Sequence, residues 1–409
     1  MKKILRKILK AIIFFAGTII GLMLLYIVFN LNLFHKEKIL SSVQIKIYLK
    51  SIDNENSDPF KFVADKFDNH SIVFLGELHK RKQDLDFFSK LILYLYETKK
   101  INVIGWEFGA AEYQKDADSL VTASEFDRKK AIAIMRNSMY FWCYEEYLNI
   151  FKTIWQINKT ITQDKEKIRF LQLNRPYNPR LLNSPDKNIR LEEIKKGNFD
   201  NTLPGIVEKE VIQQNKKILI YCGLHHSLTK FKTPKFFFLK DNMRAGQMLY
   251  EKYPDKIFQI CILPPFPPRW FLYKELTHNQ KYKLVYPFDA VFNQMYDSLK
   301  RSFAVNTKDS AFANLKDYNS FYAFDTWGGI KLKNFCDGII MLNSFDQIEP
   351  VNFITDWVTT DEELIQVKNV LREEDSKQIK SIPDLINYIN PTVNINGIRE
   401  FHKLKVFWK

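Results

Sequence analysis

The fold of this chain is decided by residues 71–79, which read Ser-Ile-Val-Phe-Leu-Gly-Glu-Leu-His. The apolar residues before the glycine do not alternate with polar ones, so the pattern predicts a strand that is buried on both faces. Residues 218–226 repeat this arrangement, with an apolar run before Gly-Leu-His-His. A third apolar run, residues 101–106, is followed by Glu107. Three predicted strands therefore end in acidic or imidazole side chains.

An amphipathic helix pattern over residues 85–95 separates the first strand from the next one along the chain. The order strand, helix, strand predicts parallel pairing with a right-handed crossover. We therefore expect an α/β fold: a mainly parallel central sheet flanked by helices, with a helical insertion at residues 110–160 and an N-terminal transmembrane helix. Residues 177–200 are rich in Asn and Lys, and we expect a surface loop there.

The first 40 residues differ from the rest of the chain. Five basic residues precede residues 11–34, a stretch of 24 residues whose only clearly polar members are Thr18, Asn30 and Asn32. A helix needs about 20 apolar residues to span a bilayer, so this stretch is long enough. No small-x-small cleavage site follows it. We expect a retained anchor, with a cleaved signal as the alternative, and a body exported to the periplasmic or extracellular side.

The same patterns divide the chain into four expected parts. Residues 1–40 form the cytoplasmic basic tip and the membrane anchor or signal, and residues 41–58 form a linker. Residues 59–345 form the α/β domain, and residues 346–409 form a C-terminal helical extension.

Composition narrows the classes of partner. The content of 46% hydrophobic and 26% charged residues is ordinary for a globular protein. The net charge is +14, and residues 1–40 alone hold seven Lys or Arg and one Glu. No basic run interleaved with aromatics follows, so we expect no nucleic-acid partner. The four cysteines form no Cys-x-x-Cys pair, and we expect buried thiols in place of a disulfide framework.

Ligands of open α/β sheets collect at the carboxyl ends of the strands, so we expect Glu77, His79, Glu107 and His226 to form one site. Side chains two residues apart in an extended segment point the same way, which lets Glu77 and His79 act together. Of the adjacent histidines, His226 has the register of the first motif, and His225 is the less favoured candidate.

Two chemistries suit these residue types. The four residues could hold a divalent metal ion that leaves a position open for water, with His225 as a less favoured ligand. Alternatively, His79 held by Glu77 or Glu107 could act as a general base without a metal. Both routes lead to hydrolysis of an ester or an amide.

The paired Gly-x-x-His motifs, the first as Gly-Glu-x-His, resemble the erythromycin esterase, ChaN and Tiki superfamily. Its members include macrolide esterases, haem-binding bacterial lipoproteins and metal-dependent proteases. Agreement with the esterase-like branch extends to Phe141-Trp142 with Glu145-Glu146, to residues 169–174 and to residues 244–249. The resemblance implies Glu77, His79, Glu107 and His226 as site residues. Asn174 stands where this family commonly has an acid.

Two functions follow as hypotheses. The first is a membrane-anchored, exported hydrolase of a small-molecule or peptide substrate, with residues 110–160 and 264–270 as pocket walls. The second is a non-catalytic protein that binds haem or another ligand, with Tyr140, Trp142 and Tyr144 lining an apolar slot and a His or Tyr as the axial ligand.

Overall fold

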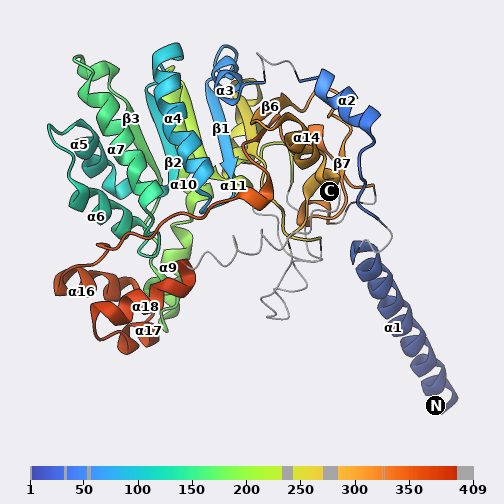
Figure 1. The fold of residues 1–409 in the computed structure, drawn as a ribbon. Helices are drawn as coiled ribbons and strands as arrows, with labels where there is room; N and C mark the ends of the chain where they lie inside the picture. Colours follow the sequence, from blue (N-terminus) through green and yellow to red (C-terminus); the bar gives the residue numbers. More distant parts are fainter. Residues whose placement is uncertain are drawn as a thin grey trace.

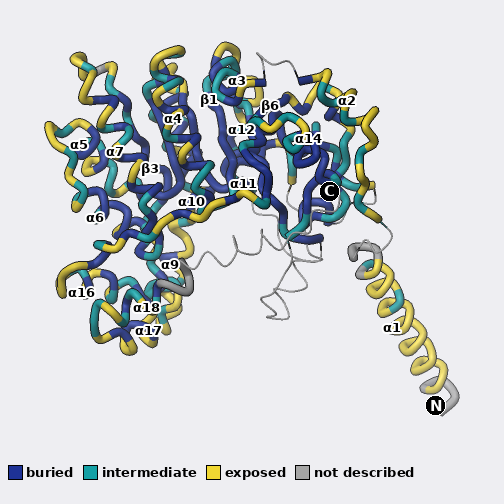
Figure 2. The backbone as a smooth tube through the Cα atoms, viewed as in Figure 1, coloured by how far each residue is buried: buried dark blue, intermediate teal, exposed yellow. Residues whose placement is uncertain are grey.

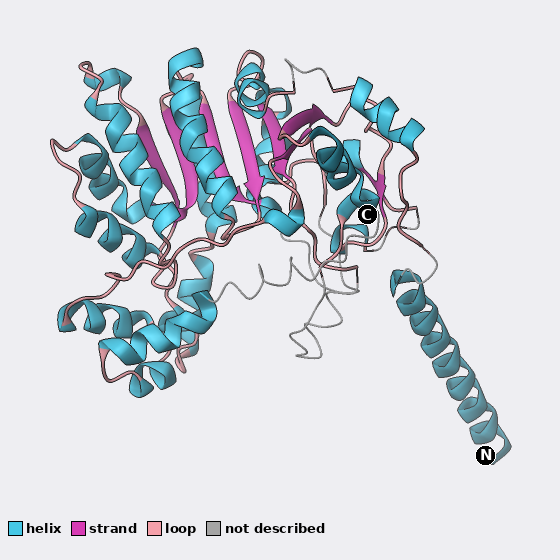
Figure 3. Ribbon diagram, in the orientation of Figure 1, coloured by secondary structure: helices cyan, strands magenta, loops and turns pink. Residues whose placement is uncertain are grey.

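The structure is a computed structural model that describes residues 2–31, 35–52, 57–232, 243–269, 284–324, 326 and 328–393. Its centre is a seven-stranded sheet in the order β3-β2-β4-β1-β5-β9-β6 (Figures 1 and 3). The strands are β1 Ile72–Glu77, β2 Val103–Ala110, β3 Arg169–Asn174, β4 Ile218–Gly223, β5 Ile257–Ile262, β6 Phe303–Asn306 and β9 Gly338–Met341. Six of them run parallel and β6 is antiparallel to β9. The expected mainly parallel sheet is confirmed.

Helices cover both faces of the sheet, as the continuous apolar strands require. On one face Val73 and Leu75 of β1 pack in a core with α3 Pro59–Lys66, α4 Lys82–Lys99 and α7 Glu145–Lys159. On the other face Ile72 and Phe74 pack with α10 Phe199–Val207 and α12 Ala245–Lys252. Figure 2 shows the sheet as the most buried layer.

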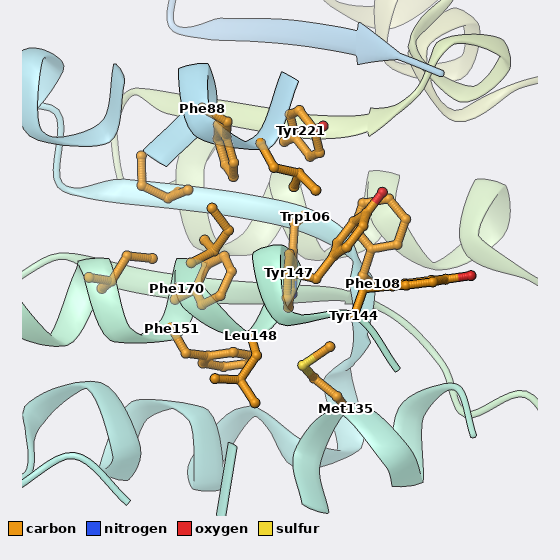
Figure 4. Packing of buried hydrophobic residues seen from close by; sticks show 14 of the residues in the cluster. Phe88, Trp106, Phe108, Met135, Tyr144, Tyr147, Leu148, Phe151, Phe170 and Tyr221 are labelled. Atoms are coloured by element: carbon orange, nitrogen blue, oxygen red, sulfur yellow. The ribbon is translucent and has the colours of Figure 1, made fainter. Parts of the chain in front are cut away.

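The first core is aromatic beneath the carboxyl ends of β2 and β4 (Figure 4). Phe88 stacks on Tyr221 with ring centroids 4.3 Å apart. Phe108 packs edge to face on Tyr147 at 4.6 Å. Aromatic pairs of this geometry add about 0.5–1.5 kcal/mol each beyond area burial. They make a rigid floor directly behind the strand ends.

The expected helical insertion is present as α5 Gln114–Thr122, α6 Arg128–Ser138 and α7. The expected surface loop at residues 177–200 is wrong, because helices α8 Pro179–Leu182 and α9 Lys187–Lys195 and the start of α10 occupy it. Each of these helices has a side-chain N-cap, from Asn178, Asp186 and Asn198. Several of the polar residues in this stretch therefore serve as helix N-caps.

A second, smaller core surrounds the far end of the sheet. It contains α14 Val291–Leu299, α15 Leu332–Phe335, α11 Leu224–Ser227 and the two-stranded sheet of β7 Lys316–Asp317 and β8 Ile330–Lys331. The C-terminal part of the described chain forms α16 Asp361–Val370, α17 Glu373–Gln378 and α18 Ile382–Val393. All four cysteines are buried and free, as expected.

The N-terminal helix α1, Lys2–Leu31, extends away from the body (Figure 1). Its segment Arg6–Tyr26 is long and apolar enough to cross a membrane, a test that a signal sequence also passes. Within residues 41–58, expected to be a linker, helix α2 Ser42–Lys50 forms with a Ser41 capping box. Gln294 of α14 bonds the backbone of Lys38 and Leu40. This segment therefore packs against the body.

Candidate active site

The end of β1 carries a carboxylate and an imidazole that are joined to each other. Glu77 is the last residue of β1 and is 1% exposed, whereas the side chain of His79 is 36% exposed. His79 Nδ1 lies 2.5 Å from Glu77 Oε1. The ring edge also contacts the rings of Phe108 and Trp142, with centroids 5.4 Å and 5.1 Å away. His79 is thereby held in one orientation, and its Nε2 has no hydrogen-bond partner among the described residues.

Glu107 links the next two strands. It lies where the pairing of β2 with β3 shifts register, between Trp106 and Ala110. The sequence predicted a strand that ends before Glu107, but β2 continues through this irregularity to Ala110. Glu107 Oε2 accepts a hydrogen bond of 2.8 Å from the backbone N–H of Gly223, the last residue of β4.

Gly223 is small because the site requires it. A Cβ at this position would lie 2.7 Å from His79 Cε1, 3.2 Å from His79 Nε2 and 3.3 Å from Glu107 Oε2. The free nitrogen of His79 and the carboxylate of Glu107 therefore meet at the bare backbone of Gly223, as a glycine permits. The ends of β1, β2 and β4 converge at this point.

His226 completes the group from helix α11, which begins directly after β4. Its Nε2 lies 3.3 Å from Glu107 Oε1 and its Nδ1 lies 2.7 Å from Asp200 Oδ1. Asp200, in the first turn of α10, also accepts hydrogen bonds from the N–H of Ala245 at 2.9 Å and from Arg244 Nη1 at 3.2 Å. The four expected residues thus lie together, with Asp200 and Arg244 as additions that the sequence did not reveal.

The two histidines of this group, His79 and His226, differ in their pKa values. Burial works against a charged His226, but Glu107 and the hydrogen bond to Asp200 outweigh it and raise the pKa of His226 to about 10. Burial likewise opposes ionisation of Glu107, yet His226 and His79 lower its pKa to about 2. The pKa of His79 is raised above 6.5, because Glu77 outweighs the effect of burial. At neutral pH the site therefore holds an imidazolium at His226, while His79 titrates above 6.5.

His225 and Asn174 have other partners. His225 Nε2 lies 3.1 Å from the hydroxyl of Tyr322, and burial lowers the pKa of His225 to about 3. Asn174 Nδ2 donates to the backbone oxygen of Glu107 at 3.0 Å, and its Oδ1 accepts from the N–H of Arg175. An aspartate could not donate to that oxygen. Asn174 therefore holds the backbone beneath Glu107.

The donor set does not fit a metal ion as it is arranged. Both ring nitrogens of His226 are engaged by carboxylates, and an imidazolium offers no lone pair to a metal. Within the described ranges, no group of three or more His, Cys, Asp or Glu side chains is disposed to hold a metal ion. The chemistry below is therefore derived from the side chains alone.

Tyr140, Trp142 and Tyr144, expected as an apolar slot, are at most 9% exposed and belong to the packed core. Of the other expected wall, residues 264–269 are described and Trp270 lies outside the described residues. A cleft of about 490 Å³ adjoins the site and includes Glu107 and His226 in its lining. A larger hollow, about 900 Å³, is lined by Phe62, Phe258 and Asp337, among others, and by none of the four candidate residues.

Some of these features had no signal in the sequence. Asp200 lies at the start of a helix that composition disguised as a loop, and nothing in its neighbours marks it as the partner of a histidine 26 residues away. Had residues 198–207 been predicted as a helix, Asp200 would have lain in its first turn, where acidic residues are common. That alone would not have identified its contact.

No protein-family model matches the sequence, and no curated protein matches it. Solved structures similar to this chain include a succinoglycan biosynthesis protein, at 11% identity and a TM-score of 0.47 over 77% of this chain and 100% of that one. An erythromycin esterase mutant, EreC in its open conformation, matches at 14% identity and a TM-score of 0.46, over 72% and 95%. ChaN of Campylobacter jejuni with cofacial haem matches at 15% identity and a TM-score of 0.29, over 50% and 86%.

These neighbours include the esterase and the haem-binding protein of the superfamily that the motifs resemble. Structural likeness at these identities and TM-scores gives no information about the chemistry of this site.

Proposed function

We propose that this protein is a hydrolase of an ester or amide, in which His79 takes the proton of a water molecule. The single observation that carries the proposal is the state of the His79 ring. Its Nδ1 is fixed on the buried Glu77 at 2.5 Å, and the ring edge of Cε1 and Nε2 lies beside the bare backbone of Gly223, with no described partner for Nε2. A carboxylate on Nδ1 fixes the tautomer and leaves the lone pair on Nε2.

The reaction uses four side chains in distinct roles. His79 in its neutral form, which predominates above its raised pKa, accepts a proton from water at Nε2, and the oxygen of that water attacks the carbonyl carbon. The positive charge of the His226 imidazolium, whose Nε2–H contacts Glu107 at 3.3 Å, stabilises the developing oxyanion electrostatically. When the tetrahedral intermediate collapses, His79 returns its proton to the leaving alcohol or amine. Glu77 orients His79, and Glu107 orients His226, which it contacts at 3.3 Å.

The test uses the full chain in detergent against a panel of p-nitrophenyl esters and short peptide amides. We expect turnover of at least one member and a loss of about 10²–10⁴-fold in kcat for His79→Ala, the usual contribution of a general base. His70→Ala is the matched control, because His70 bonds the backbone of Lys66 near the amino ends of the strands. Equal activity of the His79→Ala variant and the wild type would refute the proposal, provided circular dichroism shows both folded.

Metal assistance, the other route expected from the sequence, is separated in the same assay. Activity that survives prolonged dialysis against EDTA supports the side-chain mechanism, in line with the engagement of both His226 nitrogens. Activity that is lost and then restored by a divalent ion would support the metal route. Haem binding without catalysis is the remaining alternative, and a Soret band on titration with hemin, together with no turnover, would support it.

We also propose that α1 is a retained anchor and that the body lies on the exported side. Support comes from the apolar segment Arg6–Tyr26 and from the basic residues before it, which favour the cytoplasmic side. The mass of the protein purified from membranes, together with protease accessibility in intact cells, tests both statements. A mass that lacks the first 30 or so residues would show cleavage of a signal.

A further inference from the structure

The cleft beside Glu107 and His226 has walls of two kinds. Its uncharged polar lining is made mainly of amides, and its apolar lining comes from the loop after β3, from α8, α9 and α10 and from the insertion. The amides belong to Asn174, Asn178, Asn198 and Asn201, and the apolar side chains to Met139, Pro176, Tyr177, Leu182, Ile194 and Phe199. Its volume of about 490 Å³ lies in the range of small-molecule pockets.

Every charged side chain that lines this cleft has a partner of opposite sign. Glu107 faces His226 at 3.3 Å. Deeper in the wall, Arg175 Nη2 lies 3.1 Å from Glu193 Oε1, and the two side chains are only 14% and 5% exposed. Arg175 Nη1 also donates to the backbone oxygen of Gly197 at 3.0 Å. The lining therefore presents no uncompensated charge to a ligand.

The amides leave donors for a ligand. The side-chain oxygen of Asn178 caps α8 through the N–H of Leu181, and that of Asn198 accepts from the N–H of Asp200. The oxygen of Asn201 accepts from the N–H of Asn198. In the described part of the chain, no acceptor is paired with the NH₂ groups of these three side chains. These NH₂ groups offer N–H donors, which suit carbonyl, ether and hydroxyl oxygens.

We propose that this cleft receives an uncharged, oxygen-bearing apolar part of the substrate, and that the Arg175–Glu193 pair determines this specificity by keeping the cleft neutral. The proposal rests on the proposed function, because the occupant is a part of the ester or amide that His79 and His226 act upon. It goes further by assigning a charge class to the substrate and a role to two residues outside the reacting group.

The physical reason is the cost of moving a charge out of water. An ionised group that enters the cleft loses its hydration and finds no free counter-charge, whereas an uncharged apolar group gains from burial. If Glu193 loses its charge, Arg175 becomes an available counter-ion for an anionic ligand. If Arg175 loses its charge, Glu193 keeps only the more exposed Lys196 as its cationic partner and attracts a cationic ligand more weakly.

The experiment uses three esters of equal length on the full chain: p-nitrophenyl hexanoate, which is neutral, the mono-p-nitrophenyl ester of adipic acid, which is anionic, and p-nitrophenyl 6-aminohexanoate, which is cationic. The wild type should favour the neutral ester in kcat/KM. Glu193→Gln should shift the ratio of anionic to neutral kcat/KM upward by about tenfold, equivalent to about 1.4 kcal/mol. Arg175→Gln should shift the ratio of cationic to neutral kcat/KM upward by a smaller factor, because Lys196 still contacts Glu193 at 3.0 Å.

Lys196→Gln is the matched control. Lys196 contacts the other oxygen of Glu193 at 3.0 Å, but its side chain is 56% exposed and does not line the cleft. Its removal should leave both ratios unchanged. A higher anionic ratio in Glu193→Gln and a higher cationic ratio in Arg175→Gln, with neither change in the control, support the proposal. Identical ratios in all four proteins, or a wild type that prefers a charged ester, would overturn it.

Binding separates this proposal from the hydrolase proposal. The His79→Ala variant is titrated calorimetrically with the three matching p-nitroanilides, which tests the cleft without turnover. Selective binding of the neutral anilide with no hydrolysis by the wild type supports the cleft assignment and refutes the hydrolase. The cleft assignment alone is refuted if the wild type hydrolyses the esters, the three anilides bind equally well, and the three esters are turned over equally fast.

Discussion

His225 and His226 are neighbours in the chain and lie in opposite environments. His226 contacts the carboxylates of Glu107 and Asp200, and its pKa is raised to about 10. His225 contacts the hydroxyl of Tyr322 and the ring of Phe321, and burial lowers its pKa to about 3. At neutral pH one ring is a cation and the other is neutral. The difference shows that the position of a helix start, one residue after β4, determines which histidine reaches the carboxyl edge of the sheet.

The largest expected effect on this comparison is catalytic. His226→Gln should lower kcat by about 10²–10³, the usual cost of losing one oxyanion donor, because glutamine carries no positive charge. His225→Gln should retain near wild-type kcat, since the glutamine can still contact Tyr322 and the carbonyl group is bound elsewhere. Steady-state kinetics on the best ester of the panel measures both. An equal loss in the two variants would mean that the side of α11 that faces Glu107 has no special role.

The next effect is on stability and has opposite signs for the two residues. His226 binds its proton up to a pKa of about 10 when folded, against 6.5 in the unfolded chain. Its contribution to the free energy of unfolding is complete below pH 6.5 and is lost as the pH rises to about 10. His225 is depressed to about 3, so the unfolded chain binds this proton first, and the free energy of unfolding falls as the pH falls from 6.5 to 3.

Urea denaturation at pH 5, 7 and 9 measures these slopes. Each pKa unit is worth about 1.4 kcal/mol, so the changes amount to a few kcal/mol. His226→Gln should flatten the decline between pH 7 and 9, and His225→Gln should flatten part of the decline between pH 7 and 5. Wild-type slopes in both variants would contradict the assigned protonation states.

A smaller effect should follow from the partner of His226. Asp200→Asn removes a carboxylate that raises the pKa of His226, so the imidazolium should be lost at lower pH. A fall of one pKa unit, from about 10 to about 9, would lower the imidazolium fraction and with it kcat/KM by about twofold at pH 9, by nearly tenfold above pH 10, and not measurably at pH 7. Asp337→Asn is the matched control, because Asp337 pairs with Lys230 at 2.5 Å, outside the candidate site. An unchanged alkaline limb in Asp200→Asn would show that Asp200 does not support the charge of His226.

The sequence predicted the ends of β1 and β4 well, whereas β2 continues past its expected end to Ala110. Continuous apolar runs mark buried parallel strands, and Glu77, His79, Glu107 and His226 follow such runs directly. Since parallel strands end at one edge, their meeting could be inferred without coordinates. The distinction between His225 and His226 was also available from the register of the two Gly-x-x-His motifs, although not the depth of the difference.

The remainder of the site depends on contacts that leave no local pattern. Asp200 reaches His226 because α10 packs beside α12, and a sequence rich in Asn and Lys concealed α10. The hydrogen bonds of Asn178 and Asn198 show that these residues are helix caps. Composition alone could not show this, because asparagines are equally common in loops. The close approach of His79 to Gly223 depends on the tertiary position of His79. From the sequence alone, the glycine indicated only that a close approach was sterically possible.

The smallest expected effect comes from removing a single hydroxyl near His225 or near His79. Tyr322→Phe removes the hydrogen bond to His225 Nε2, and Tyr147→Phe removes the hydroxyl that accepts from the N–H of Lys80, directly after His79. Each change should lower the free energy of unfolding by about 1 kcal/mol, the net worth of one hydrogen bond. Only Tyr147→Phe should also lower kcat, because it loosens the turn that holds His79. A loss of kcat in Tyr322→Phe as large as that in Tyr147→Phe would place His225 in the working part of the site.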